Sequence, residues 1–550
     1  TDKLRFMLNV NGFRDNSDVK AAQYIATVPL VAGGVIPPQL ANYPLPHDNR
    51  DADWTPGLAL HNNAKFYQIA LRSEYDLSDD VKITSITSYD RYKNSKISDP
   101  DGVSIRNNDY HVVGDIKTFA QELRLSGSTN GLNWMIGGNY QHDKIFERAD
   151  QNFSASTAID YFVPFGLGKF VAIDQYKDER YTTKAVFANA DYDISSQFTV
   201  HGGIRYTKNS GHSLSCGADV GDGIYATGIS LYYSLFVRPA LGLGPISIPP
   251  GGCVTVKAAT PASIADGTAI TSIVASNSLN EDNVSWRVGL DWKPSSDLLV
   301  YANVSKGYKG GSFPLFGPAV DTQTAPARQE ALLAYELGFK ATLADRRVQL
   351  NAAVFHYDYT DKQFAGRVIL DPNLFGAIES IVNVPKSRVT GAEVQLDIAP
   401  MRGLTLSTGV TYLDTKVKNF SNFNIFGVVT DFSGQSFPGS PKWQMLGDVQ
   451  YKWRTSDKID AFVGAAGNYQ SRTNGLFGQY PLFDIKSWAT LDLRAGIEAA
   501  DQSWRVSIWG RNVTNTYYWN SANKVLDTAI RFAGAPATYG ITFSFRGKGK

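Results

Sequence analysis

The stretch Trp488–Glu498 reads WATLDLRAGIE, and its residues alternate in character with a period of two. Odd-numbered positions from 489 to 497 are apolar, whereas Thr490, Asp492, Arg494 and Glu498 are polar or charged. Successive side chains of a strand point to opposite faces, so one face of this segment is apolar and the other can carry full charges. The apolar phase lasts about ten residues, the length of a tilted membrane strand. The stretch therefore predicts one strand of a transmembrane β-barrel.

The same alternation recurs along the whole chain, for example in Ala537–Arg546 and Val348–Tyr357. A soluble half-buried sheet gives the same pattern, but not at this length and number of strands. We predict eighteen strands, near residues 4–13, 64–77, 81–93, 117–127, 132–148, 175–193, 197–212, 282–293, 297–308, 329–344, 346–362, 386–399, 403–417, 440–453, 457–472, 484–499, 503–513 and 536–546.

The connections between these strands alternate between short and long. Short turns rich in Gly, Pro, Asp, Asn or Ser are predicted at 77–80, 128–131, 194–196, 294–296, 345, 400–402, 454–456 and 500–502. Long excursions are predicted at 14–63, 97–116, 209–281, 310–328 and 418–439. Short periplasmic turns and long extracellular loops are typical of outer-membrane barrels. This asymmetry favours a barrel over a propeller or a sandwich.

Composition narrows the class of protein further. Charged residues make up 19% of the 550 residues, below the roughly 25% of soluble proteins. The net charge of +1 argues against nucleic acid as a partner. No apolar run approaches the ~20 residues that a membrane helix needs. No secretory signal begins at Thr1, so we expect the natural precursor to start upstream.

Two cysteines, Cys216 and Cys253, fall in one long stretch without a strand pattern. In an oxidising compartment such a pair is expected to form a disulfide, and two unpaired thiols are the alternative.

Six stretches of the sequence form recognisable motifs. They are DLLVYANVSKGYKGGSF at 297–313, ELGFKATLADRRVQLNAAVFHYDY at 336–359, NVPKSRVTGAEVQL at 383–396, WGRNVTNTYY at 509–518, ATYGITFSF at 537–545 and VKITSITSYDRY at 81–92. These motifs resemble those of TonB-dependent receptors, the energy-coupled importers of Gram-negative outer membranes. The resemblance covers nearly all the predicted strands, and it does not extend to the long loops.

The resemblance implies an all-β, antiparallel barrel of 22 strands preceded by a TonB box and a globular plug. Residues 1–546 would form the barrel, and residues 547–550 a C-terminal tail after Phe545. Because the sequence contains eighteen predicted strands, we expect the natural protein to contain the plug and about four further strands as well. Unpaired strand edges in lipid are prohibitively costly.

The resemblance also implies energy-coupled uptake of a nutrient, a ferric siderophore or a similar complex, across the Gram-negative outer membrane. Its partners would be outer-membrane lipid, the TonB–ExbB–ExbD complex acting through the TonB box, and a ligand such as a siderophore, haem, cobalamin or a saccharide. Other outer-membrane or surface proteins are further candidates. No nucleic acid and no cofactor is expected.

Two sets of residues are candidates for function. Lumen-facing charges are expected to contact the plug, with water as the alternative: Glu122, Arg124, Arg205, Glu336, Lys340, Glu393, Asp397, Asp492 and Arg494. Aromatics in the loops suit a flat ligand, although packing of the loops against one another is the simpler interpretation of each: Tyr225, Tyr232, Tyr233, Phe236, Phe423, Phe426, Tyr517 and Trp519.

Catalysis has no recognisable basis in the sequence. No histidine pair has metal-ligand spacing, and no GxSxG motif occurs. Asp99, Asp101 and Asp109 could suggest Ca²⁺, but a solvated acidic loop is the preferred interpretation, and we predict no metal site. A passive porin without a plug is the alternative function, and an outer-membrane enzyme or adhesin is the third.

Overall fold

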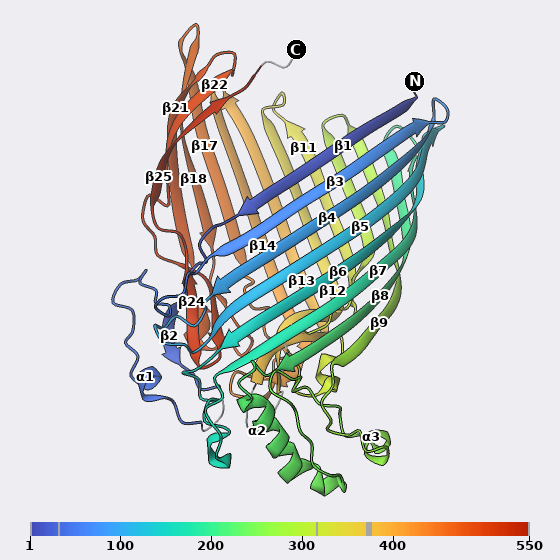
Figure 1. The fold of residues 1–550 in the computed structure, drawn as a ribbon. Helices are drawn as coiled ribbons and strands as arrows, with labels where there is room; N and C mark the ends of the chain where they lie inside the picture. The colour runs from blue at the N-terminus through green and yellow to red at the C-terminus, as the bar shows by residue number, and fades with distance from the viewer. Residues whose placement is uncertain (1–2, 31–33, 315–316, 370–376, 548–550) are drawn as a thin grey trace.

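The eighteen predicted strands correspond to the eighteen strands of one large antiparallel sheet (Figure 1). The computed structural model describes residues 3–30, 34–314, 317–369 and 377–547. The strands of the sheet are β1 (Leu4–Asp15), β3 (Asn62–Asp76), β4 (Val81–Ser98), β5 (Asp109–Thr129), β6 (Leu132–Asn152), β7 (Ala172–Asp193), β8 (Phe198–Ala218), β9 (Ala275–Ser295), β10 (Leu298–Lys309), β11 (Glu330–Leu343), β12 (Val348–Ile369), β13 (Ala377–Met401), β14 (Leu404–Asn419), β17 (Trp443–Ser456), β18 (Ile459–Gln470), β21 (Trp488–Ala499), β22 (Trp504–Arg511) and β25 (Thr538–Phe545).

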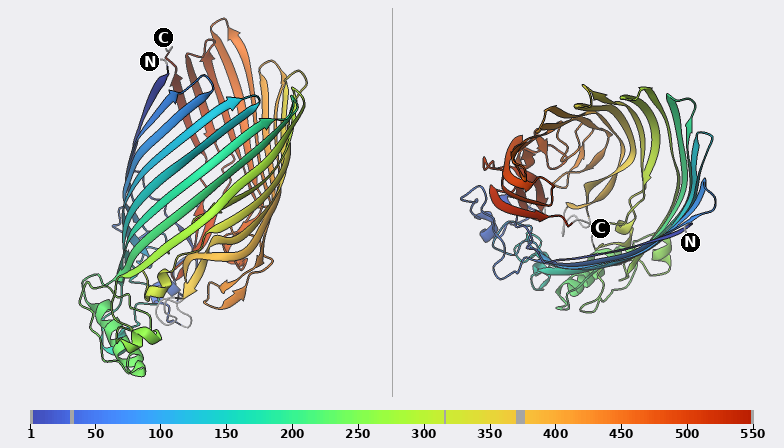
Figure 2. Two further views of the ribbon diagram at one scale, coloured as in Figure 1. Left: turned by 90° about the vertical axis from the view of Figure 1, so that its right-hand side faces the viewer. Right: turned by 90° about the horizontal axis from the view of Figure 1, so that it is seen from above.

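Each strand of the sheet pairs with the next one along the chain. The first ladder joins β1 to β3 from Leu4↔Tyr75 to Asp15↔Ala64, and the last joins β22 to β25. β1 and β25 form the two ends of this series of ladders. The tilted strands curve around a lumen, which the view along the barrel shows directly (Figure 2).

The two faces of the sheet differ in chemistry, as the alternation predicted. Large apolar side chains such as Val186, Leu337 and Val354 are exposed on the outward face. Their strand neighbours, such as Glu336, point to the lumen. Apolar side chains that face outward from such a barrel wall are stabilised by lipid.

The two ends of the barrel differ in the length of their connections, as predicted. The eight connections from β3–β4 to β21–β22 are tight turns, and both termini lie at that end of the barrel (Figure 1). Between β5 and β6 the turn is Asn130–Gly131, with φ of 45° and 79°. Positive φ at both positions defines the Asn-Gly hairpin turn, whose twist matches that of the flanking strands.

Several strands extend further toward the loops than the sequence predicted. β5 begins at Asp109 rather than near 117, and β13 begins at Ala377 rather than near 386. The expectation that Cys216 lies outside any strand is wrong, because β8 continues to Ala218. The loops pack against these extensions, and Asp109, Cys216 and Ala377 are buried there.

The long connections carry secondary structure that the sequence did not predict. They contain β2 (Gln23–Thr27), β15 (Ser421–Phe423), β16 (Val429–Asp431), β19 (Thr473–Asn474), β20 (Asp484–Ile485), β23 (Trp519–Val525), β24 (Thr528–Ala533), α1 (Pro38–Ala41), α2 (Ile224–Tyr232), α3 (Pro261–Ala265) and the short helical turns Val163–Phe165, Tyr233–Val237, Pro239–Leu241, Asp321–Thr324 and Pro481–Phe483. Among the described residues, no helix is long and apolar enough to cross a membrane.

Hydrophobic cores lie mainly in these loops. The largest buried cluster includes Phe162, Phe170 and Tyr225 and joins the β6–β7 loop to the β8–β9 loop. A second includes Phe420 and Phe432 from the β14–β17 loop. The loops are therefore small packed bodies whose positions are fixed relative to the strands beneath them.

Candidate functional site

The loop aromatics that the sequence singled out lie in three separate places. Tyr225, Tyr232, Tyr233 and Phe236 belong to α2 and the helical turn after it, within the largest loop core. The Tyr225 ring stacks on Phe170 with centroids 4.2 Å apart. Of these four, only Phe236 is largely exposed, so most of this group packs the loop.

The other predicted aromatics lie on different loops. Phe423 and Phe426 belong to the β15–β16 hairpin, where Phe426 meets Tyr480 edge to face at 5.9 Å. Tyr517 and Trp519 lie together near β2, since the Trp519 Nε1 donates to the Tyr517 hydroxyl at 3.0 Å. The structure thus gathers the eight aromatics into three groups rather than one.

Cys216 and Cys253 form a disulfide in the structure, with their Cα atoms 5.8 Å apart. Next to it, Cys253 pairs with Ala218 in an isolated bridge, and the Val254 N–H donates to the Gly217 carbonyl at 2.8 Å. The bond closes the base of the loop that carries α2.

Loops from the two ends of the chain meet at the loop end of the barrel. β2, from the first loop, pairs with β24, from the last loop, and β24 also pairs with β23, so the three strands form one sheet. Asp527, in the turn between β23 and β24, is fully buried. Its carboxylate accepts hydrogen bonds from the Leu30 N–H at 2.6 Å, the Ser156 hydroxyl at 2.6 Å and the Thr157 N–H at 3.0 Å. One carboxylate thereby joins three loops.

A cavity of about 550 Å³ lies where these loops meet the strand ends, and we call it the vestibule cavity. It faces the lumen side of β4–β7, β12 and β13. The polar residues that line it are Lys96, Ser98, Asn108, Tyr110, Glu147, Gln151, Ser156, Gln175, Arg367, Glu379, Asn523 and Lys524. A concave, mixed-polarity cavity of this size suits a small-molecule ligand.

Two buried cations distinguish the vestibule cavity. Lys524 is 5% exposed, and its Nζ donates to the Pro29 carbonyl at 3.1 Å. Burial, reinforced by the Arg367 charge, lowers the pKa of Lys524 to about 7. Arg367 is 8% exposed.

The Arg367 guanidinium is only partly satisfied. Its Nη1 donates to the Ala377 carbonyl at 3.1 Å, whereas its Nη2 has no hydrogen-bond partner among the described residues. Glu379 lies opposite Arg367 in the β12–β13 ladder and accepts from the Asn523 Nδ2 at 3.2 Å. A buried cation with a free donor favours an anionic ligand group.

Sequence reasoning missed both cations. Arg367 lies on an extension of β12 that the pattern did not predict, and Lys524 lies in a loop strand without alternation. No local signal marks either residue, because each gains its role from loops that are distant in sequence.

The acidic segment at the start of β5 is not solvated, contrary to the sequence-based expectation. Asp99, Asp101 and Asp109 are 1%, 0% and 8% exposed. The Asp101 carboxylate accepts from the N–H groups of Val103, Asn107 and Asn108. Burial and the neighbouring Asp99 raise the pKa of Asp101 to about 9. The segment is a folded turn held by its own carboxylates.

The predicted lumen-facing charges fall into local groups. Glu122 pairs with Arg124, and both line a second cavity of about 390 Å³ with Arg205. Lys340, Glu393 and Asp397 line another of about 750 Å³. Arg494 binds Asp448 through two contacts of 2.7 and 2.8 Å, and Asp492 accepts from the Asn512 N–H. Glu336 lies on β11, the strand that also carries Lys340. Contact of these residues with a plug remains a prediction.

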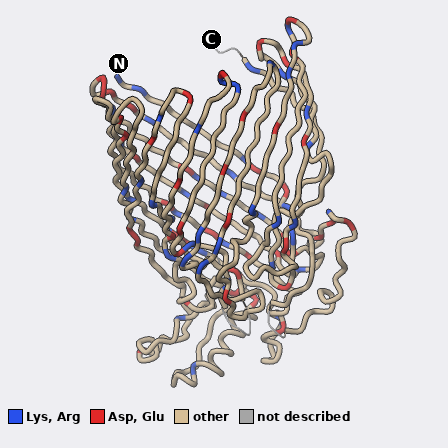
Figure 3. The backbone as a smooth tube through the Cα atoms, turned by 180° about the vertical axis from the view of Figure 1, so that it is seen from behind, with Lys and Arg blue, Asp and Glu red and all other residues tan. Residues whose placement is uncertain are grey.

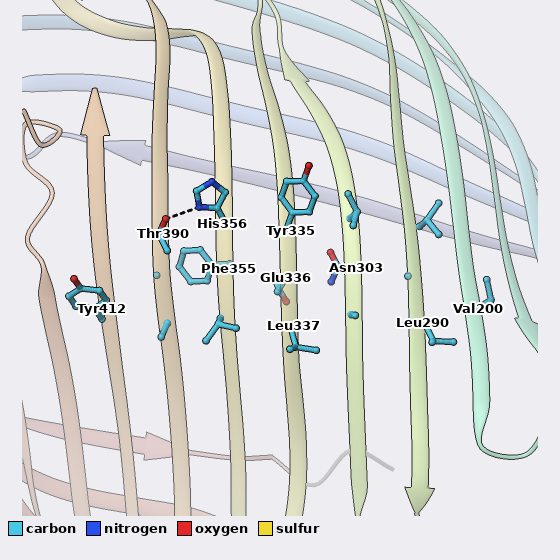
Figure 4. Close-up of a pocket in the computed structure, with 17 residues that line it drawn as sticks. Val200, Leu290, Asn303, Tyr335, Glu336, Leu337, Phe355, His356, Thr390 and Tyr412 are labelled. Atoms are coloured by element: carbon cyan, nitrogen blue, oxygen red, sulfur yellow. Dashed lines mark hydrogen bonds between the residues drawn. The ribbon is translucent and has the colours of Figure 1, made fainter. Parts of the chain in front are cut away.

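A shallow groove of about 850 Å³ lies on the outward face of β8–β14 (Figure 4). Exposed Leu337 and Val354 line it, and small Ala302 and Ala392 form its floor. At one end the His356 Nδ1 and the Thr390 hydroxyl are hydrogen-bonded at 2.7 Å. Because the groove is apolar and faces outward, it is a lipid-facing feature.

Comparisons with known proteins agree with this architecture. The family model described as "TonB dependent receptor-like, beta-barrel" matches residues 7–513. The probable TonB-dependent siderophore receptor PiuA of Acinetobacter baumannii is 26% identical over 208 residues, which are 36% of this chain and 25% of that protein. The match thus spans about a quarter of the length of this curated relative.

Solved structures share the fold at low sequence identity. The ferric yersiniabactin uptake receptor FyuA from Yersinia pestis superposes with a TM-score of 0.65 at 16% identity, over 98% of this chain and 68% of that chain. The siderophore receptor PiuA from A. baumannii gives 0.66 at 16% identity, over 99% and 72%. The ferric-catecholate import receptor Fiu from E. coli K12, in its closed form, gives 0.64 at 16% identity, over 98% and 72%.

Proposed function

Because this chain belongs to the TonB-dependent receptor-like β-barrel family, we propose that it takes part in energy-coupled import of a ferric siderophore or a similar anionic complex. The membership confirms the resemblance drawn from the sequence motifs, and it places the barrel in the Gram-negative outer membrane. The family consists of transport receptors rather than enzymes.

The vestibule cavity is the observation that carries the proposed substrate class. It lies among the loops at the extracellular end of the barrel, where an arriving ligand would first contact the protein. Its buried Lys524 and the Arg367 Nη2, which has no hydrogen-bond partner among the described residues, would bind the carboxylate or catecholate oxygens of a ferric complex. The curated relative and the solved structures named for siderophore uptake support the same class.

Iron uptake tests the proposal directly. The full-length protein would be expressed in a host that lacks its own siderophore receptors, and ⁵⁵Fe would be supplied as catecholate, citrate or hydroxamate complexes. We expect uptake of at least one complex, and we expect that deleting the host's TonB abolishes uptake while surface binding persists. Uptake that continues without TonB would contradict energy coupling and favour the passive porin.

Replacing Lys524 with Gln is expected to weaken binding of the ferric complex about tenfold to a hundredfold at pH 6, because one charged hydrogen bond is lost. Lys524→Arg should restore most of the affinity, and Lys169→Gln, on an exposed loop, should change nothing. Equilibrium binding of the complex to purified protein measures all three.

The affinity of the unsubstituted protein should depend on pH in a defined direction. With a pKa of about 7, Lys524 is a cation below neutral pH and loses its charge above it, so binding should weaken as pH rises from 6 to 8. The unfolded chain binds the lysine proton up to its ordinary pKa, so the folded state instead gains stability as pH rises above 7. A binding profile that is flat from pH 6 to 8, or identical in Lys524→Gln, would contradict the role of Lys524.

A further inference from the structure

Six lysines form a belt on the outward face of β3–β8, and we call them the lysine belt. They are Lys65, Lys93, Lys117, Lys144, Lys184 and Lys208. The period-two alternation along each strand shows on which face of the sheet each lysine lies. Lys65 lies two residues from exposed Tyr67, and Lys208 two residues from exposed Tyr206. The belt therefore shares the face of the outward apolar side chains.

The register of the sheet places these lysines directly opposite one another in pairs. Lys65 faces Lys93 across β3–β4, Lys117 faces Lys144 across β5–β6, and Lys184 faces Lys208 across β7–β8. Like charges directly opposite in a ladder are destabilising. Three successive hairpins thus carry the same unfavourable pair at a similar height.

The protein supplies few counter-charges for this belt. Asp115 binds the neighbouring Arg91 at 2.7 Å and lies 3.9 Å from both Lys93 and Lys117. Within the part of the chain that the structure describes, Lys65, Lys144, Lys184 and Lys208 form no ion pair. Figure 3 shows that Lys and Arg also gather toward the loop end of the strands on the other side of the barrel.

The height of the belt matches the surface of the outer leaflet. A band of exposed aromatics, including Tyr67, Phe119, Tyr140 and Tyr206, lies on the turn side of the belt. Such bands mark the boundary between lipid tails and headgroups. The lysines lie just beyond it, on the loop side, where lipid headgroups carry their phosphates.

We propose that the lysine belt binds the phosphate groups of an outer-leaflet lipid, with the acyl chains against the apolar wall below. Each pair of opposed ammonium groups then shares an anion, so the repulsion between them becomes a bidentate site. This inference rests on the outer-membrane location and is independent of the imported ligand.

A variant in which three of the belt lysines are replaced by uncharged residues tests the proposal. Lys65→Gln, Lys144→Gln and Lys208→Gln together remove one member of each pair. A charge-matched control is Lys293→Gln, Arg402→Gln and Lys458→Gln, three substitutions at or near the short turns. The probe is lipid A added to the protein in a zwitterionic detergent, and bound lipid is counted by native mass spectrometry. We expect the belt variant to bind lipid A at least about tenfold more weakly than the control.

Thermal stability supplies a second readout with a change of sign. Without lipid and at low salt, the belt variant should melt above the unsubstituted protein, because repulsion between the lysines is removed. With lipid A, the unsubstituted protein should gain the larger stabilisation. Lipid A stripped of both phosphates should not stabilise the unsubstituted protein more than the belt variant, and the two proteins should bind it equally weakly. Equal binding of lipid A by the two variants, or binding of the stripped lipid as tight as that of intact lipid A, would overturn the proposal, as would stabilisation by inorganic phosphate alone to the same extent.

Discussion

Replacing Asp527 with Asn is expected to loosen the junction of three extracellular loops by about 3–5 kcal/mol of local opening free energy. The fully buried carboxylate accepts from Leu30, Ser156 and Thr157, and both of its oxygens are used. An amide offers one acceptor oxygen and places an N–H₂ donor against groups that also donate. Several buried donors would lose their partner at once.

Hydrogen exchange measures this loss at defined positions. The amides of Leu30 and Thr157 should lose protection by about a hundredfold or more, whereas amides in the barrel strands should keep theirs. Asp431→Asn is the matched control, because Asp431 lies on an exposed hairpin and, among the described residues, accepts only from Ser433. The substitution should also weaken ligand binding, because Leu30 and Ser156 line the vestibule cavity. Unchanged exchange at Leu30 and Thr157 would show that Asp527 does not hold the junction.

Removing the disulfide with Cys216→Ser and Cys253→Ser should cost the α2 loop about 4 kcal/mol of stability. The bond closes a loop of sequence separation 37, and the chain entropy released on opening a loop of that length sets the magnitude. The barrel wall should be unaffected, because its ladders do not depend on this loop.

Chymotrypsin provides a local readout of this change. Tyr225 and Tyr233, inside the loop, are 3% and 8% exposed and belong to the largest loop core. Cleavage after these two residues should become rapid in the double variant, and reducing agent should produce the same effect in the unsubstituted protein only. Cleavage after exposed Phe426, outside the disulfide loop, should be equal in both. Persistent protection of Tyr225 and Tyr233 would mean that packing of the loop core, rather than the disulfide, fixes the loop.

The sequence by itself determined the architecture of the barrel wall. Period-two alternation identified all eighteen strands of the sheet and their two faces, and turn residues such as Asn130 and Gly131 identified its tight end. These features are local: the facing of a side chain follows from its neighbours two residues away, and a hairpin turn from the residues inside it. The motifs that resemble TonB-dependent receptors lie in the same strands, and they too are local features of the sequence.

The tertiary structure alone decided the site and the loops. Arg367 and Lys524 are 157 positions apart in the chain, and Asp527 meets Leu30 across 497 positions. No local pattern encodes such contacts, because they form only when the barrel brings distant loops together. The strand extensions at Asp109 and Cys216 were missed because these two positions are buried among the loops rather than exposed to lipid, so the lipid-facing alternation does not mark them.

The lysine belt lies between these two cases. Alternation alone gives the outward face of each lysine, but the pairing of Lys65 with Lys93 needs the register of β3 against β4. That register follows from the length and conformation of the connecting turn, and a slip of one residue would turn every side chain of a strand to the other face. The sequence thus determined which residues face the membrane, and only the folded sheet decided which charges oppose each other, because opposition is a property of two strands at once.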